Sequence, residues 1–146
     1  MVAPSAHDRG LVLLRDGQRC VACHTRTSPL EMQHRQAVGA GGSKVRPRPH
    51  ELATACCTCN RRFESDLQTE ALALGWKVRR WVKDAGEVPM FNRPRAVWGR
   101  LTREGGVVLL RPDDAIARMR EVYGPDWDRW AAESRISLPT TERNSL

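Results

Sequence analysis

The chain has 146 residues, enough for one modest hydrophobic core but too few for two full ones. Its 24 lysines and arginines outnumber its 17 aspartates and glutamates, which gives a formal net charge of +7. Residues 1–111 have 19 basic and 10 acidic side chains, whereas residues 112–146 have 5 and 7. A charge concentrated in this way favours a polyanionic partner, namely nucleic acid, over a charge that serves solubility alone.

No apolar run approaches the length of a transmembrane helix, and no basic start leads into an apolar segment as in a signal peptide. We therefore expect a cytoplasmic protein with no membrane partner. The cytosol keeps thiols reduced, so the 5 cysteines are expected to be metal ligands and a spare thiol, and not disulfides.

The first predicted helix contains the apolar run 11–14 and ends at Asp16-Gly17, because glycine accepts the left-handed conformation of a helix cap. Residues 36–49 are rich in glycine and proline and predict a loop. Three cations on it, Lys44, Arg46 and Arg48, are either a phosphate-contacting arm or ordinary solvated side chains.

Residues 58–74 predict one helix that stops at Gly75, since apolar side chains recur at helical spacing at Phe63, Leu67, Ala71 and Leu74. Asn60 and Glu64 are four residues apart and would share a face of it. Alternating side chains over residues 76–82 predict a strand.

The C-terminal part predicts a hairpin and two helices. Val97–Leu101 and Val107–Leu110 flank a glycine turn. Asp113–Tyr123 has helical spacing, with Asp113 or Asp114 as its cap and Gly124 as its stop. A further helix is expected from Pro125, with Trp127, Trp130 and Ala131 on one face, and the polar composition of residues 136–146 predicts a disordered tail.

Two CxxC pairs, Cys20 with Cys23 and Cys56 with Cys59, are the most informative motif of the chain. A CxxC turn directs two sulfur atoms to one ion, and zinc prefers four such ligands in tetrahedral geometry, so the spacing predicts a structural zinc site. Cys57 is the expected spare thiol because it is one residue too close to Cys59 for CxxC spacing.

Between Leu11 and Val82 several short motifs have the order found in HNH endonucleases of tailed bacteriophages and actinobacteria. They are Arg15-Asp16-Gly17-Gln18-Arg19-Cys20, Gln33-His34-Arg35, Gly41-Gly42, Glu51-Leu52 and Cys59-Asn60-Arg61-Arg62. The chain resembles this family over about half of its length. The resemblance implies an α+β fold with a zinc-stapled ββα-metal (His-Me finger) core over residues 1–82, a first strand near residues 30–35, and a hairpin and helical extension over residues 83–135.

The resemblance also implies metal-dependent hydrolysis of DNA phosphodiester bonds. His34 would be the general base, since imidazole titrates close to neutral pH. At the two ligand positions of the family the chain has Asn60, whose amide oxygen would hold Mg²⁺ or Mn²⁺, and Gln33, whose neutral amide gives the cation much less than a carboxylate would. Glu64 either supplies the carboxylate that Gln33 lacks or is a plain exposed residue of the helix.

Glu51 occupies the position where the family has asparagine, and a carboxylate can accept but not donate a hydrogen bond. We expect it to accept a proton from His34 and thereby to raise the pKa of that histidine. Its neighbour His50 is a phosphate contact, a support for the site or a simple loop residue.

The DNA-contacting side chains are expected to be Arg35, Lys44, Arg46, Arg48, Arg61 and Arg62. The resemblance further implies a partner of the phage packaging machinery, a terminase or a portal. The departures at Gln33 and Glu51 favour an alternative of another class, a catalytically weak or inactive zinc module that binds DNA or docks a protein partner.

Overall fold

The computed structural model describes residues 2–37 and 45–136. Lys44, the Gly41-Gly42 pair and all but the first residue of the predicted tail lie outside the described residues.

Helices and strands alternate irregularly along the chain, which gives a mixed α+β fold. The helices are α1 (Ala6–Arg15), α2 (Cys57–Arg62), α3 (Gln68–Ala73), α4 (Pro112–Tyr123) and α5 (Pro125–Glu133). The strands are β1 (Leu30–His34), β2 (Leu52–Cys56), β3 (Met90–Asn92), β4 (Val97–Leu101) and β5 (Val107–Leu110). Antiparallel pairing joins β1 to β2 in one sheet and β3, β4 and β5, in that order, in another.

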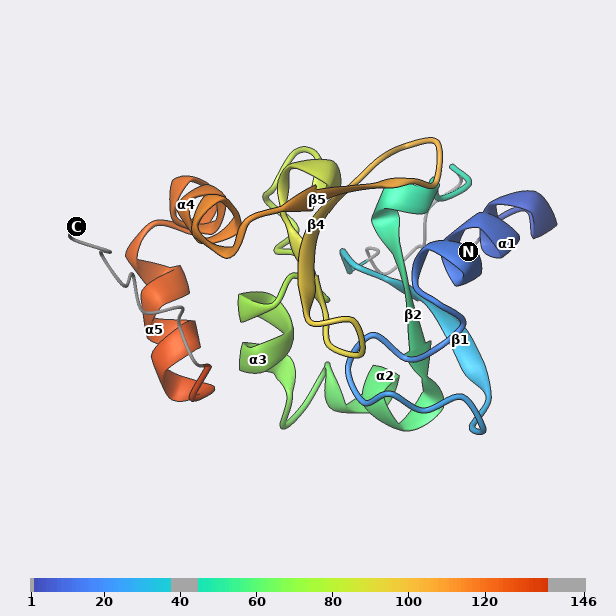
Figure 1. Ribbon diagram of the computed structural model, residues 1–146, viewed down its shortest axis with the longest axis horizontal. Coiled ribbons are helices and arrows are strands. Elements are labelled where there is room, and N and C mark those ends of the chain that lie inside the picture. The colour runs from blue at the N-terminus through green and yellow to red at the C-terminus, as the bar shows by residue number, and fades with distance from the viewer. Residues whose placement is uncertain (1, 38–44, 137–146) are drawn as a thin grey trace, which may run out of the picture.

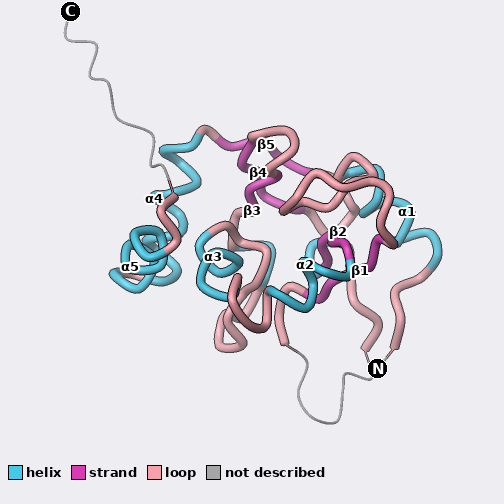
Figure 2. Tube along the Cα trace, turned by 90° about the horizontal axis from the view of Figure 1, so that it is seen from below, coloured by secondary structure: helices cyan, strands magenta, loops and turns pink. Residues whose placement is uncertain are grey.

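In Figure 1 the pair α4 and α5 lies at one end of the molecule and α1 with β1 and β2 at the other, with α3 and the second sheet between them. The view from below in Figure 2 has the same order. None of the helices in residues 2–37 and 45–136 is long and apolar enough to cross a bilayer.

One hydrophobic cluster runs through both the zinc-motif half and the C-terminal extension, from Cys20 to Ala131. Trp127 of α5 is fully buried, and its indole Nε1 donates a hydrogen bond to the Ala73 carbonyl of α3 at 2.9 Å. Residues 83–135 therefore complete the core on which the N-terminal half packs.

The lead-in helix is confirmed as α1, and Gly17 after it has φ +78°. A buried ion pair between Arg15 and Asp16 ties its end to the first sheet. The Arg15 guanidinium donates to the Leu52 carbonyl at 2.7 Å, and Asp16 accepts the Thr54 backbone N–H at 2.9 Å. These bonds fix β2 against α1.

The single helix expected over residues 58–74 is wrong, because a turn over residues 63–67 separates α2 from α3. The Leu67 N–H bonds to the Arg62 carbonyl at 2.8 Å, five residues back, and not to the Phe63 carbonyl, which an α-helix would require. Ser65 and Asp66 are weak helix formers whose side chains compete with the backbone, which explains the break. The stop at Gly75 is confirmed, with φ +74°.

The expected strand over residues 76–82 is also wrong. Only Val78 forms a bridge, to Gln36, before the chain turns over residues 79–82. The predicted hairpin is confirmed as β4 and β5, whereas β3, with only 3 residues, is too short to have a readable period.

Both C-terminal helices are confirmed, and Trp127, Trp130 and Ala131 form the buried face of α5. The expected cap of α4 is wrong, because the N-cap is Arg111 and Pro112 is the first helical residue. Proline suits this position, since it has no N–H to leave unpaired. Asp113 and Asp114 lie instead in the first turn, where a carboxylate interacts favourably with the helix dipole.

Candidate functional site

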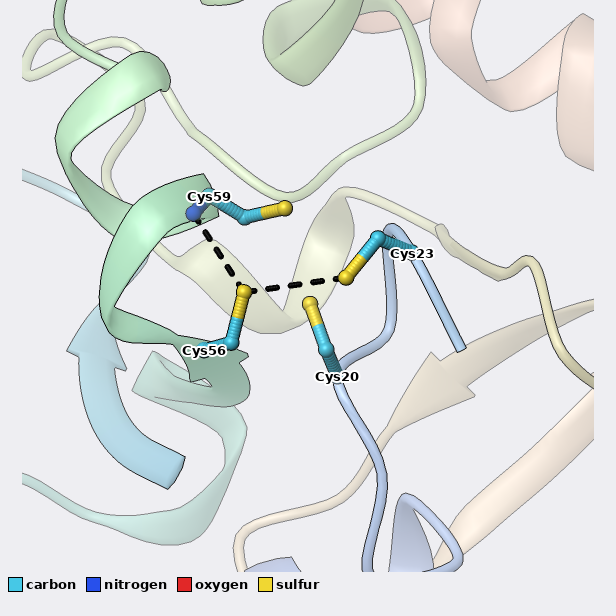
Figure 3. A group of neighbouring side chains, drawn as sticks. All are labelled: Cys20, Cys23, Cys56 and Cys59. Carbon is cyan, nitrogen blue, oxygen red and sulfur yellow. Dashed lines mark hydrogen bonds between the residues drawn. The ribbon is translucent and has the colours of Figure 1, made fainter. Parts of the chain in front are cut away.

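The sulfur atoms of Cys20, Cys23, Cys56 and Cys59 all lie within 4.8 Å of one another (Figure 3). The Cys23 and Cys56 sulfurs are 3.6 Å apart, and a tetrahedral zinc site with Zn–S bonds of about 2.3 Å has edges of about 3.8 Å. The predicted four-cysteine cluster is therefore confirmed as a group that could bind a metal such as zinc.

Backbone N–H groups donate to two sulfurs of this cluster and oppose the effect of burial on those thiols. The Cys59 N–H donates to the Cys56 sulfur and the Ala22 N–H to the Cys20 sulfur, both at 3.4 Å. Burial raises the pKa of the Cys20 and Cys59 thiols, and a divalent cation is what offsets that cost. Cys57 lies outside the cluster, as expected.

His34 is the last residue of β1, pairs with Leu52 across the sheet and is half-buried. Burial lowers its pKa below the ordinary value of 6.5; the charge of Glu51 raises the pKa in opposition, and that of Lys77 lowers it further. The expectation of a raised pKa is therefore wrong, because the loss of solvation outweighs the carboxylate.

Glu51 has a structural partner of its own. Its carboxylate accepts the Arg48 backbone N–H at 2.7 Å and so caps the short 3-10 helix Pro49–Glu51. His50 in the same helix is buried, 3.5 Å from the Asp84 carboxylate, and burial lowers its pKa. His50 is thus neither a plain loop residue nor an exposed phosphate contact.

Gln33 faces the interior and not the solvent side of β1. Its side chain is 2% exposed, and its Nε2 donates to the Trp76 carbonyl at 2.8 Å. Successive side chains of a strand point to opposite faces, so Gln33 and His34 diverge. The expectation that Gln33 joins His34 at a metal ion is contradicted by this burial.

Two polar contacts, one hydrogen bond and one ion pair, lie next to β1. Asn60 on α2 donates its amide Nδ2 to the Glu31 carboxylate of β1 at 2.7 Å. The Glu64 carboxylate forms an ion pair with the Lys77 ammonium at 2.6 Å, and this ammonium also donates a hydrogen bond to the His34 carbonyl at 3.1 Å. Glu64 is therefore already engaged with a cation.

Glu31 and Lys77 were not singled out from the sequence. Glu31 lies two residues before Gln33, on the same face of the strand, and this spacing is the one signal that could have found it. Lys77 reaches the site only because the chain returns to β1 after α3, which no local pattern indicates.

Arg35 is not a DNA contact, which overturns the expectation for this residue. Its side chain is 0% exposed, and the guanidinium donates to backbone carbonyls of four residues, Gly75, His50, Ala85 and Val88. Burial lowers its pKa to about 9. Arg35 instead gathers three chain segments around the end of β1.

The other described cations of the predicted DNA surface are all exposed, namely Arg46, Arg48, Arg61 and Arg62. Arg48 lies 3.7 Å from the Asp8 carboxylate, and Arg62 pairs with Asp66 one turn along at 2.7 Å. Exposed pairs of this kind are weak and can be exchanged for phosphate contacts.

Comparison of the chain with protein-family models, with curated proteins and with solved structures gives no match.

Proposed function

We propose that the chain is a zinc-stabilised, metal-dependent endonuclease of the HNH type, with His34 as its general base. The observation that carries the proposal is the half-buried His34 at the end of β1, whose pKa lies below 6.5. An imidazole of this kind is neutral at physiological pH and can accept a proton from an attacking water.

The order of the surrounding elements supports the same reading. The antiparallel pair β1 and β2 leads directly into α2, which begins within the second CxxC motif and carries Asn60. This is the order of a ββα-metal finger, with the cysteine cluster at the junction of strand and helix. A metal at the cluster would stiffen the junction and so hold α2 in place beside β1.

A divalent ion such as Mg²⁺ or Mn²⁺ would stabilise the charge that develops on the scissile phosphate and on the departing oxygen. Mg²⁺ is commonly held by one or two protein oxygens together with water and phosphate. Asn60 would supply its amide oxygen, whereas Glu31, to which its amide donates, lies on the Gln33 face of β1, opposite His34, and would not bring the ion to the base. Glu64 would first have to release Lys77, and Gln33 is buried.

Lys77 has a separate role in the proposal. Its ammonium lies at hydrogen-bond distance from the His34 carbonyl and is only partly exposed. A cation there favours the neutral form of His34 and can neutralise a phosphate oxygen beside it.

A second candidate function is a nucleic-acid-binding module without catalysis. The burial of Gln33 favours it, as does the finding that residues 2–37 and 45–136 contain no group of three His, Cys, Asp or Glu ligands besides the cysteine cluster. The basic surface and the zinc cluster serve this function equally well.

Relaxation of supercoiled plasmid by the purified protein distinguishes the two. We expect nicking in Mg²⁺ or Mn²⁺, none in EDTA, and a loss on the order of a hundredfold to ten-thousandfold in His34→Ala. His7→Ala, which removes an exposed histidine of α1, is the matched control and should keep full activity.

Nicking that persists in EDTA, or equally in His34→Ala, would point to a contaminating nuclease and contradict the proposal. If no metal elicits cleavage but the protein still retards DNA in a gel, the binding module is the better description.

A further inference from the structure

Trp81 differs from every other tryptophan of the chain. Of the 5 tryptophans, 4 are buried, with exposed fractions of 0 to 6%, whereas Trp81 is 61% exposed. The indole is among the largest apolar groups and normally supplies core or interface energy. A ring left this open therefore marks an interaction surface more than a packing defect.

Cations flank the exposed ring on both sides in the chain. Arg79, Arg80 and Lys83 are all exposed. The Arg79 guanidinium lies over the Trp130 ring at 5.5 Å, and within the described part of the chain neither Arg80 nor Lys83 has a carboxylate partner. The positive charge beside Trp81 is thus free for an outside anion.

The turn that carries Trp81 is held rigidly. The Val82 N–H bonds to the Arg79 carbonyl at 3.1 Å, and the Gln36 amide donates to both the Arg79 and the Val82 carbonyls, at 3.1 and 2.7 Å. A single side chain therefore fixes both ends of the turn. Fixing the ring before binding reduces the entropy that a ligand must overcome.

Tyr123 supports the ring without covering it. The two ring centroids are 5.5 Å apart with an interplanar angle of 86°, an edge-to-face contact. Such a contact occupies at most one face of the indole, which leaves the other face open for a flat partner.

The turn lies beside the end of β1. Val78 bridges to Gln36, two residues beyond His34, and two residues of extended chain span about 7 Å. Lys77, at the start of the same segment, donates to the His34 carbonyl. A ligand seated on Trp81 would therefore extend toward the proposed general base.

We propose that Trp81 stacks on an unpaired base of a nucleic acid while Arg80 and Lys83 contact the flanking phosphates. Stacking is the usual way in which single-stranded nucleic acids are held, since every base has a flat face that is hidden inside a duplex. The preferred substrate is then a single strand or a branched or frayed duplex. This inference rests on the proposed function only for the cleavage that follows binding.

An anionic membrane surface is the competing partner, because tryptophan and basic residues also gather at bilayer interfaces. The neighbouring apolar side chains of the segment, Val78 and Val82, are buried. One flat ring between cations offers too little apolar surface for insertion into lipid, whereas it matches one base and its phosphates.

The test is a titration of the full, zinc-loaded chain with a labelled single strand of about 12 thymidines, without Mg²⁺ or Mn²⁺ so that no cleavage occurs. Binding is followed by anisotropy of the label and by tryptophan fluorescence. We expect quenching of the solvent-exposed indole and weaker binding of a matched duplex. Trp81→Ala should weaken binding of the single strand by roughly 5- to 150-fold.

Two variants make the test specific. Trp81→Phe should keep binding within a few-fold but lose the quenching, because phenylalanine still stacks. Leu14→Ala removes another exposed apolar side chain, 65% exposed on α1, and should change nothing. Circular dichroism and zinc content show whether each variant is folded.

Binding without quenching in the wild type, or equal affinity of folded Trp81→Ala, would overturn the inference. So would a response to phosphatidylserine vesicles in place of the oligonucleotide. If single-strand binding depends on Trp81 but plasmid nicking is absent, the endonuclease fails and the stacking site stands. If nicking depends on His34 but neither nicking nor single-strand binding depends on Trp81, the endonuclease stands and the stacking site fails.

Discussion

At the scale of single residues, the two side chains that differ most from expectation are those of Gln33 and Arg35, which are both polar and both buried. Arg35 follows His34 and was expected to contact DNA, yet its guanidinium is buried and bonded to backbone carbonyls. A sequence records that a side chain is charged but not which carbonyls will surround it. Only the return of residues 75–88 to the end of β1 creates that environment.

The lowered pKa of His34 leads to a prediction about pH. A general base must be unprotonated, so cleavage should be lost as the pH falls through the pKa of His34, at a midpoint below 6.5. Glu51 raises this pKa and Lys77 lowers it. Glu51→Gln should therefore move the acid limb of kcat/KM to lower pH, and Lys77→Met should move it to higher pH.

The measurement is the pH profile of kcat/KM on a short labelled DNA for the wild type and both variants. Glutamine can still accept the Arg48 N–H, so Glu51→Gln preserves the cap of the 3-10 helix. His7→Ala should leave the limb unmoved. Shifts of both variants in one direction would exclude His34 as the titrating base, and an acid limb above 6.5 in the wild type would contradict its lowered pKa.

At the scale of elements, the sequence predicts those segments that end at a clear stop or turn signal such as glycine. Glycines at 17, 75 and 124 end helices where expected, and the strands of the hairpin β4–β5 have their expected bounds. The failures come from tertiary structure. Residues 58–74 keep a helical apolar period through a turn, because Phe63 and Leu67 still pack on one side of the same core.

Gly75 gives the element-scale prediction. It ends α3 with φ +74°, and a Cβ there would overlap the Pro89 carbonyl oxygen just before β3. Gly75→Ala combines left-handed strain with displacement of that backbone and should cost more than about 2 kcal/mol of unfolding free energy.

Gly10→Ala is the matched control, since Gly10 lies within α1 and an added Cβ meets nothing within 4 Å. It should stabilise the protein by about 0.5–1 kcal/mol. Urea unfolding followed by circular dichroism measures both. Equal stabilities of the two variants would show that β3 does not depend on the close approach at Gly75.

At the scale of the whole molecule, the cysteine cluster was the part of the site most open to prediction, because CxxC spacing encodes a local turn. The Glu31–Asn60 and Lys77–Glu64 contacts were not, since each joins segments that no short-range pattern relates. Three of its cysteines, Cys20, Cys56 and Cys59, also belong to the hydrophobic core that runs from Cys20 to Ala131. Loss of metal should therefore reach further than the turn that holds it.

The last prediction concerns that coupling. Purified protein should contain about one zinc per chain, and because a structural zinc site contributes its binding free energy to folding, Cys59→Ser should lower the melting temperature by on the order of 10 °C or more. Cys57→Ser is the matched control, since Cys57 directly follows Cys56 in the chain but is not part of the cluster. It should keep both zinc and melting temperature. The near-ultraviolet circular dichroism of the buried tryptophans reports the shared core, and chelation should diminish it together with the helical signal. A metal-free chain that melts like the wild type and keeps this tryptophan signal would show that the fold needs no ion at the four thiols.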